Sequence, residues 1–180
     1  MMEDLDMSNR KETISDWFHQ YSHDVYDYLV YYTGKTDVED LVQETFIKAG
    51  KGLQSYQSKS SPKTWMISIA RNVAIDETRK RQRRIWNNAS SFDERFGVDD
   101  AETPEKILMQ SEAIQELYLA IQQLKKNYRD VVILRGIKGF SVAETAEILN
   151  WKETKVRTNY HRALKDLRQS TNRKGGMFDG

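Results

Sequence analysis

The sequence predicts an all-α protein made of two small helical domains, one on each side of a flexible acidic linker. Apolar residues recur every three to four positions along most of the chain, and only two prolines and nine glycines interrupt it. A stretch from residue 85 to 111 lacks this periodicity and is rich in acidic residues. We therefore expect a flexible N-terminus (1–12), a first domain (13–84), the linker (85–111), a second domain (112–168) and a flexible tail (169–180).

Three helices are expected in the first domain. The first ends at Gly34 and carries on one face Trp17, Phe18, Tyr21, Val25, Tyr28, Leu29 and Tyr32. The second helix is expected to begin with a capping box formed by Thr36 and Glu39. The third begins at Ser61 and Pro62, which suit an N-cap and a first helical position, and it ends in a basic cluster.

The second domain is expected to begin with two apolar helices. The apolar face of the first comprises Ile114, Leu117, Tyr118, Ile121 and Leu124. The run Val131–Leu134 could form a strand, but the apolar residues at helical spacing around it favour a buried helix. Gly136 and Gly139 are expected to break that helix.

A helix-turn-helix is expected over residues 140–167. A capping box of Ser141 and Glu144 begins its first helix, and Asn150 stands where a left-handed residue ends it. The second helix is expected from about Lys152 to Arg168, and its outer face near the start comprises Lys155, Arg157, Thr158, His161 and Arg162. Such a face suits the DNA major groove, where basic side chains contact base edges and neutralise phosphates. An amphipathic helical hairpin with solvated basic residues is the alternative.

Charge is strongly segregated along the chain, although the net charge is only +1. Residues 61–84 carry seven Lys and Arg against two Asp and Glu, and residues 113–180 carry thirteen against seven. Residues 1–60 and 85–112 are acidic, with eleven and seven acidic residues against six and two basic ones. Two basic blocks suggest two DNA-facing surfaces on one chain, although ordinary fluctuation of surface charge could give the same pattern.

The third helix and the serine-rich loop before it suit single-stranded nucleic acid. Aromatic side chains offer stacking surfaces to unpaired bases, and a row of cations holds the backbone. Trp65 lies at one end of the helix, and the other end carries Arg79, Lys80, Arg81, Arg83 and Arg84. The alternative is that Trp65 belongs to the core and the arginines are a solvated helix end. For Trp65 the core role is the favoured one.

The second helix is expected to expose an acidic ridge, which comprises Glu39, Asp40, Gln43 and Glu44 beside Lys48. An acidic ridge of this kind can dock a basic partner helix. Taken alone, however, these residues favour an ordinary solvated helix face.

Several classes of function are excluded or disfavoured. The chain has no cysteine, which rules out disulfides and thiolate metal sites. Its acidic start is no signal peptide, and no apolar run approaches the roughly 20 residues that span a bilayer, so we expect a cytoplasmic protein. His19 and His23 have a spacing that can bind metal, but no further clustered ligand accompanies them, and neither a metal nor a cofactor is expected. Because no nucleotide-binding or catalytic motif is present, we do not expect an enzyme.

Three segments, in this order, resemble conserved regions of the extracytoplasmic-function (ECF) sigma factors, group 4 of the sigma-70 superfamily. Residues 37–48, DVEDLVQETFIK, resemble region 2.2. Residues 64–76, TWMISIARNVAID, resemble regions 2.3 and 2.4, and residues 140–168 look like region 4.2. The combination of the three is far more specific than any one of them.

The resemblance implies a bacterial transcription initiation factor that binds core RNA polymerase, directs it to promoters and catalyses no reaction itself. The residues that would dock on a basic coiled coil of the β′ clamp are Asp40, Gln43 and Glu44. Those that would engage the −10 element on the melted strand are Tyr56, Lys63, Trp65, Asn72, Arg79, Lys80, Arg83 and Arg84. Those that would meet the −35 element, within a helix-turn-helix over 141–162, are Lys155, Arg157, Thr158, His161 and Arg162. An anti-sigma factor, possibly anchored in the membrane, would be a further partner.

A stand-alone regulator of the LuxR-like helix-turn-helix kind is the second hypothesis. Its N-terminal unit would sense a signal or dimerise, and it would bind palindromic duplex DNA without polymerase. A sigma factor is expected to bind DNA weakly alone and to gain specificity with the polymerase core.

Overall fold

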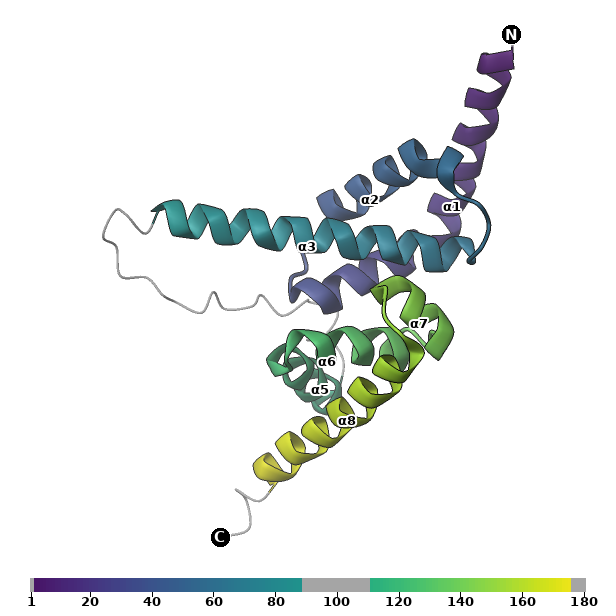
Figure 1. Ribbon diagram of the computed structural model, residues 1–180. Helices are drawn as coiled ribbons and strands as arrows, with labels where there is room; N and C mark the ends of the chain where they lie inside the picture. The colour runs from purple at the N-terminus through teal and green to yellow at the C-terminus, as the bar shows by residue number, and fades with distance from the viewer. Residues whose placement is uncertain (1, 89–110, 176–180) are drawn as a thin grey trace. The chain divides into compact units, whose positions relative to one another are not determined.

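The structure of the chain is a computed structural model that describes residues 2–88 and 111–175, and every element in those ranges is helical (Figure 1). The described helices fall into two compact units on either side of residues 89–110. The all-α prediction with two helical domains is therefore confirmed. No helix in the described ranges is both long enough and apolar enough to cross a membrane.

Unit 1 is a bundle of three helices, each of which packs against the other two. They are α1 (Met2–Thr33), α2 (Glu39–Gly52) and α3 (Pro62–Asn88), and the short 3-10 turn η1 (Leu53–Ser55) follows α2. The core contains Tyr28, Leu29, Met66, Ile67 and Val73, none of which is more than 1% exposed. As predicted, α1 stops where Gly34 takes a left-handed conformation, with φ 71°, that a residue with a Cβ rarely adopts.

Between residues 111 and 175, unit 2 contains four α-helices and one π-helical turn. They are α5 (Glu112–Gln123), α6 (Lys126–Val131), the π-turn η2 (Val132–Ile137), α7 (Val142–Leu149) and α8 (Glu153–Gly175). The run Val131–Leu134 is helical and buried, as predicted. Gly136 does not break this segment as expected: it lies inside η2, where an added Cβ would come within 3.5 Å of the Tyr160 hydroxyl on α8. A Cβ at that distance would make an ordinary van der Waals contact, so packing there does not require a glycine. Gly139, with φ 72°, makes the turn.

Three predicted ends are wrong because the helices run further than expected. Helix α1 begins at Met2 and α8 continues to Gly175, so the predicted flexible N-terminus (1–12) and most of the tail (169–180) are helical. Helix α3 continues past residue 84 to Asn88. Neither glycine nor proline interrupts these extensions before their last residues, so the hydrogen-bonded ladder propagates beyond the packed part of each helix. Residues 89–110, most of the predicted linker, lie outside the described ranges.

The start of α2 also differs from the prediction. The helix begins at Glu39, and Val38 occupies the N-cap position without a side-chain hydrogen bond. Val38 is fully buried, and its backbone carbonyl accepts a 2.9 Å hydrogen bond from the Val42 N–H. Burial of Val38 therefore determines where the helix begins, and the expected capping box of Thr36 and Glu39 is wrong.

Candidate nucleic-acid interface

The loop between α2 and α3 is held in place by hydrogen bonds within itself. Ser61 caps α3 as predicted, because its Oγ accepts a 3.1 Å hydrogen bond from the Thr64 N–H and donates to Thr64 Oγ1 at 2.9 Å. The Tyr56 hydroxyl donates to the Ser60 carbonyl at 2.5 Å, which closes the loop across Ser58. Ser58 adopts a left-handed backbone with φ 54°. These hydrogen bonds give the loop a defined backbone conformation.

Three aromatic rings, one of them from the loop itself, pack against one another beside this loop. The Tyr56 and Trp65 rings lie 4.9 Å apart between centroids. Trp17, from α1, forms T-shaped contacts with both rings, with centroids 5.4 Å from that of Tyr56 and 6.0 Å from that of Trp65. All three side chains are half-buried, so each packs against the bundle and still presents part of its surface to solvent. Trp65 thus packs against the bundle, the role that the sequence favoured, while part of its ring remains accessible to solvent.

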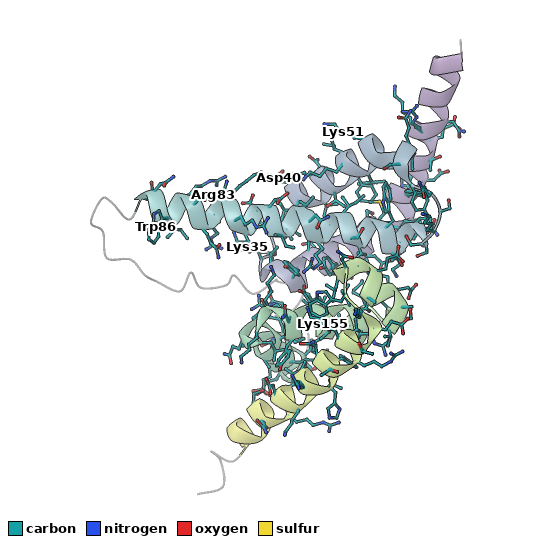
Figure 2. The ribbon with its side chains drawn as sticks, in the orientation of Figure 1. Lys35, Asp40, Lys51, Arg83, Trp86 and Lys155 are labelled. Carbon is teal, nitrogen blue, oxygen red and sulfur yellow. The ribbon has the colours of Figure 1, made fainter. Side chains whose placement is uncertain are left out.

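The polar residues predicted for this surface differ in their surroundings. Lys63, at the start of α3, forms a 3.1 Å ion pair with Asp24 of α1, and both side chains are about one-third exposed, at 34% and 29%. Asn72, nine residues further along α3, is exposed. Beyond it, the side chains of Arg79, Lys80, Arg83 and Arg84 are exposed; Figure 2 labels Arg83 among them.

The predicted acidic ridge is present on α2. Asp40, labelled in Figure 2, and Gln43 are exposed, and Glu44 is half-buried beside them. Lys48 lies 3.1 Å from Glu44 and 3.6 Å from Asp76 of α3. The hydrogen bond with Glu44 is the main cause that raises the pKa of the Lys48 ammonium above its usual value. Lys48 therefore links the ridge to α3.

Unit 2 contains a helix-turn-helix with the predicted local geometry. The capping box at the start of α7 is complete, with Ser141 Oγ accepting from the Glu144 N–H at 3.1 Å and Glu144 Oε2 accepting from the Ser141 N–H at 2.8 Å. Asn150 ends α7 with φ 53° and ψ 48°. The Trp151 N–H then donates to the Ala146 carbonyl at 2.9 Å, which closes the turn before α8.

Helix α8 packs by one face and exposes the other. Val156, Ala163 and Leu167 are buried against the rest of unit 2. The five residues predicted to meet DNA are all exposed: Lys155, Arg157, Thr158, His161 and Arg162. An α-helix with a free basic face near its N-terminus has the shape and charge that fit a major groove.

Neighbouring side chains hold two of these basic groups in place. Arg157 Nη2 donates to Glu153 Oε2 at 2.7 Å, one turn earlier on the same helix. Lys155 Nζ lies 4.0 Å from the centroid of the Trp151 ring, in the turn before α8. Two cations of the basic face, Lys155 and Arg157, are thus held in place by neighbouring side chains.

Sequence reasoning missed several residues of these surfaces. Trp17 and Asp24 come from α1 and join the loop only through the tertiary fold, so no local signal could have placed them there. Glu153 could have been found, because an acid four residues before an arginine is a recognised helical pair. Trp86, which is 81% exposed at the end of α3, was assigned to the linker.

His23, one of the two histidines whose spacing could suit a metal, is paired with an aspartate. His23 Nε2 lies 3.4 Å from Asp27 Oδ2, one turn along α1. Within residues 2–88 and 111–175, no group of three or more His, Cys, Asp or Glu side chains is placed to share a metal ion.

Comparison with known proteins places both units in one family. Residues 17–84 match the family profile of sigma-70 region 2, and residues 114–167 match that of sigma-70 region 4. The ECF RNA polymerase sigma factor SigX of Bacillus subtilis (strain 168) is 39% identical over 162 residues, which is 88% of this chain and 84% of that protein. RNA polymerase sigma factor YlaC of the same organism is 32% identical over 161 residues, 89% of this chain and 92% of that protein.

Solved structures agree with these matches. The sigma factor RpoE of Bartonella quintana, in complex with the anti-sigma factor NepR, superimposes with a TM-score of 0.71 at 25% identity, over 88% of this chain and 96% of that one. CnrH, in complex with the cytosolic domain of CnrY, has the same fold, with a TM-score of 0.67 at 18% identity over 92% of each chain.

Proposed function

Because the chain belongs to the ECF sigma factors, transcription initiation factors that direct RNA polymerase to promoters, we propose a role for each of its described surfaces. The family match over residues 17–84 does not support the stand-alone regulator, whose N-terminal unit would be a sensor. The chain itself catalyses no reaction: its contribution is binding and orientation. We place it in the cytoplasm, where the polymerase is.

The acidic ridge on α2 docks the polymerase core. Asp40 and Gln43 are exposed and can pair with basic and polar groups of a partner helix, here the coiled coil of the β′ clamp. Glu44 joins them once a clamp cation replaces Lys48, its present partner at 3.1 Å. The three side chains lie within about one helical turn, which fits one face of a single partner helix.

The loop before α3 binds the melted −10 strand. Its backbone shape is set by the Tyr56–Ser60 hydrogen bond and by the ring of Trp17 beneath it. The exposed parts of Tyr56 and Trp65 offer stacking surfaces to unpaired bases, and Asn72 offers an amide that can donate and accept hydrogen bonds. Lys63 and the exposed cations of α3, Arg79, Lys80, Arg83 and Arg84, neutralise phosphates along the strand.

The helix-turn-helix binds the −35 element as duplex DNA. Helix α8 enters the major groove with its N-terminal turns, and Arg157, Thr158, His161 and Arg162 face the base edges and the phosphates. Lys155, stacked on Trp151, contacts the backbone beside the groove. The observation that carries this proposal is the completely formed helix-turn-helix, with an exposed basic face on its second helix.

An anti-sigma factor is the expected regulatory partner. The solved RpoE structure is a complex with the anti-sigma factor NepR, and the CnrH structure is a complex with the cytosolic domain of CnrY. We propose that a partner of this class, possibly anchored in the membrane, covers the docking ridge or the DNA-binding surfaces of this chain and is removed when transcription is required.

A run-off transcription assay tests the proposed function. The full chain and a matched core polymerase are incubated with genomic fragments of the source bacterium, and a start site absent with core alone is expected. The double variant Asp40→Ala, Gln43→Ala should lose this start site and co-purification with core, while Lys11→Ala, an exposed change on α1, should retain both. Failure of the wild-type chain to add any start site would overturn the proposal.

A further inference from the structure

An open apolar groove lies between α1 and α2 on unit 1. Its volume is about 550 Å³, within the range of about 300–1,000 Å³ that is usual for small-molecule sites. The large apolar residues that line it are Ile14, Phe18, Phe46 and Ile47. Phe18 and Ile47 are 42% and 57% exposed, so the groove leaves apolar surface in water that a bound apolar group would cover.

The groove changes from charged to apolar along its length. Arg10 and Lys11 line one end, where the Gln54 amide oxygen accepts a 2.9 Å hydrogen bond from Arg10 Nη1. Because an amide is neutral, this bond orients the guanidinium without cancelling its charge. At the other end the Phe18 and Phe46 rings lie 4.9 Å apart between centroids. Arg10 and Phe18 are eight residues apart on α1, so the two ends are separated by about 12 Å.

Gly50 keeps the middle of the groove open. It lies inside α2, where a glycine is less favourable than an alanine. A Cβ on Gly50 would stand 3.8 Å from Ile14 Cγ1, which is an ordinary contact, so the helix packing does not require a glycine. A longer side chain at this position would extend beside Ile14 and fill the groove. The missing side chain therefore leaves space for a ligand.

Charge along α2 changes sign over the length of the groove. Lys51 is exposed in the last turn of α2 and Asp40 in its first turn, and Figure 2 labels both. An acidic partner helix along the groove would be attracted by Arg10 and Lys51 but repelled by the acidic ridge, and a basic helix would meet the reverse. A small molecule with one negative head and an apolar tail avoids this conflict, because its head contacts only the cations and its tail only the apolar end.

We infer that the groove between α1 and α2 is a binding site for a straight-chain acyl carboxylate. The planar guanidinium of Arg10 can donate two parallel hydrogen bonds to a carboxylate, and the Lys11 ammonium adds a second positive charge at the same end. The acyl chain passes over Ile14 and ends against the rings of Phe18 and Phe46.

A bound chain also affects the acidic ridge. Ile47 follows Gln43 by four residues and both are exposed, so they share one face of α2. A molecule that covers Ile47 therefore obstructs a partner helix that docks on Gln43. An acyl carboxylate should for this reason compete with the polymerase core. This consequence rests on the proposed docking role of the ridge, whereas the site itself does not.

Calorimetric titration of the full chain tests the site. The probes are hexanoate, octanoate, decanoate and dodecanoate, each below the concentration at which it forms micelles. We expect one saturable site whose affinity rises about four-fold with each added methylene, as burial of a CH2 group predicts, until the chain outgrows the groove. Decyltrimethylammonium, which has an apolar tail and a positive head, should bind at least about ten-fold more weakly than decanoate.

Three variants locate the bound carboxylate. Arg10→Gln should weaken decanoate binding about ten-fold, the scale of a lost charge-assisted hydrogen bond. Gly50→Leu should abolish binding because it fills the groove, whereas Gly50→Ala, whose Cβ makes only an ordinary contact, should retain it. Lys35→Gln removes an exposed cation elsewhere on unit 1, labelled in Figure 2, and should bind decanoate as the wild type does. Thermal unfolding checks that each variant is folded.

Co-purification with the polymerase core measures the consequence for docking. Decanoate at saturating concentration should reduce core association of the wild-type chain. Arg10→Gln should need about ten-fold more decanoate for half of that reduction, relative to its own association without decanoate. If the wild-type chain fails to associate with core even without decanoate, the proposed function fails, and the titration of the free chain still decides the site.

Other results would contradict the inference. Absence of saturable binding by all four carboxylates would overturn it and leave the groove to a protein partner. Equal affinity for decanoate and decyltrimethylammonium would mean that the groove takes any apolar tail. Binding that neither Arg10→Gln nor Gly50→Leu weakens would lie elsewhere on the chain. Saturable binding that leaves core association unchanged would overturn the competition and support the site alone.

Discussion

The two surfaces that we propose to bind DNA are built in different ways. In unit 2, the capping box, the left-handed Asn150 and the basic face of α8 lie within one continuous stretch of chain. In unit 1, the loop before α3 depends on Trp17 and Asp24, which lie more than 30 residues earlier on α1. A duplex-binding element can be a local motif, because a helix and its cap define it. A surface for unpaired bases needs a loop with a defined conformation, and in unit 1 tertiary contacts determine the conformation of the loop before α3.

This difference predicts that Trp17→Ala has the largest effect of any single change on these surfaces. The substitution removes edge contacts with Tyr56 and Trp65 and leaves a cavity at a half-buried position, which should lower the free energy of unfolding of unit 1 by about 3 kcal/mol. Amide hydrogen exchange of the full chain should show faster exchange in unit 1 and unchanged exchange in unit 2.

A second readout shows whether Trp17 positions the loop. Trp17→Phe keeps a ring edge at the same place and should restore most of the base discrimination at the −10 element that Trp17→Ala loses. If both variants discriminate −10 bases as the wild type does, the loop keeps its shape without Trp17, and the contrast between the units is wrong.

Arg157→Ala is expected to have the next largest effect, and this effect is on DNA discrimination instead of stability. Arg157 is exposed and forms its ion pair with Glu153 on the same helix, so stability should change little. Discrimination at one position of the −35 element should fall by about 2 kcal/mol, since a base-contacting arginine is lost. Competition binding of the holoenzyme to single-base −35 variants measures this. Uniform weakening across all variants would mean a phosphate contact instead.

Ser141→Ala tests how local the helix-turn-helix is. Loss of the capping hydrogen bond at the start of α7 should cost about 1 kcal/mol of unit 2 stability. Ser141→Thr retains the hydroxyl and should cost much less. Thermal unfolding with hydrogen exchange as the unit-resolved probe checks both. A loss that extends to unit 1 would contradict the independence of the two units.

The same contrast explains which structural features could be predicted from the sequence. Ser61, Ser141, Asn150 and Gly34 act through their nearest neighbours in the chain, and their predicted structural roles are confirmed. The predicted capping role of Thr36 is wrong because the start of α2 depends on the burial of Val38, which is a tertiary effect. The start of α1 was placed too late, and the ends of α3 and α8 were placed too early, because apolar periodicity stops where packing stops, whereas the hydrogen-bonded ladder does not. The roles of the predicted site residues in binding DNA or polymerase remain predictions.

The two surfaces share one feature. Each contains a cation proposed to contact DNA that is already paired with a carboxylate: Lys63 with Asp24 at 3.1 Å, and Arg157 with Glu153 at 2.7 Å. These partly exposed pairs contribute only a few tenths of a kcal/mol to stability. Their larger consequence is for binding, because each carboxylate competes with DNA for its cation and repels nearby phosphates.

Asp24→Asn and Glu153→Gln should therefore each raise the affinity for non-specific DNA, by about two- to three-fold. The increase should shrink at high salt, because screening weakens the repulsion that each change removes. The two variants should differ in specificity. Glu153→Gln frees the Arg157 side chain, which lies next to it on one helix, so −35 discrimination should fall. Asp24→Asn leaves the rings and the Tyr56 hydrogen bond that shape the loop, so −10 discrimination should persist. Filter binding with matched and scrambled −10 and −35 elements measures both quantities. Loss of −10 discrimination in Asp24→Asn would show that the Lys63 ion pair, and not the aromatic support, determines the shape of the loop.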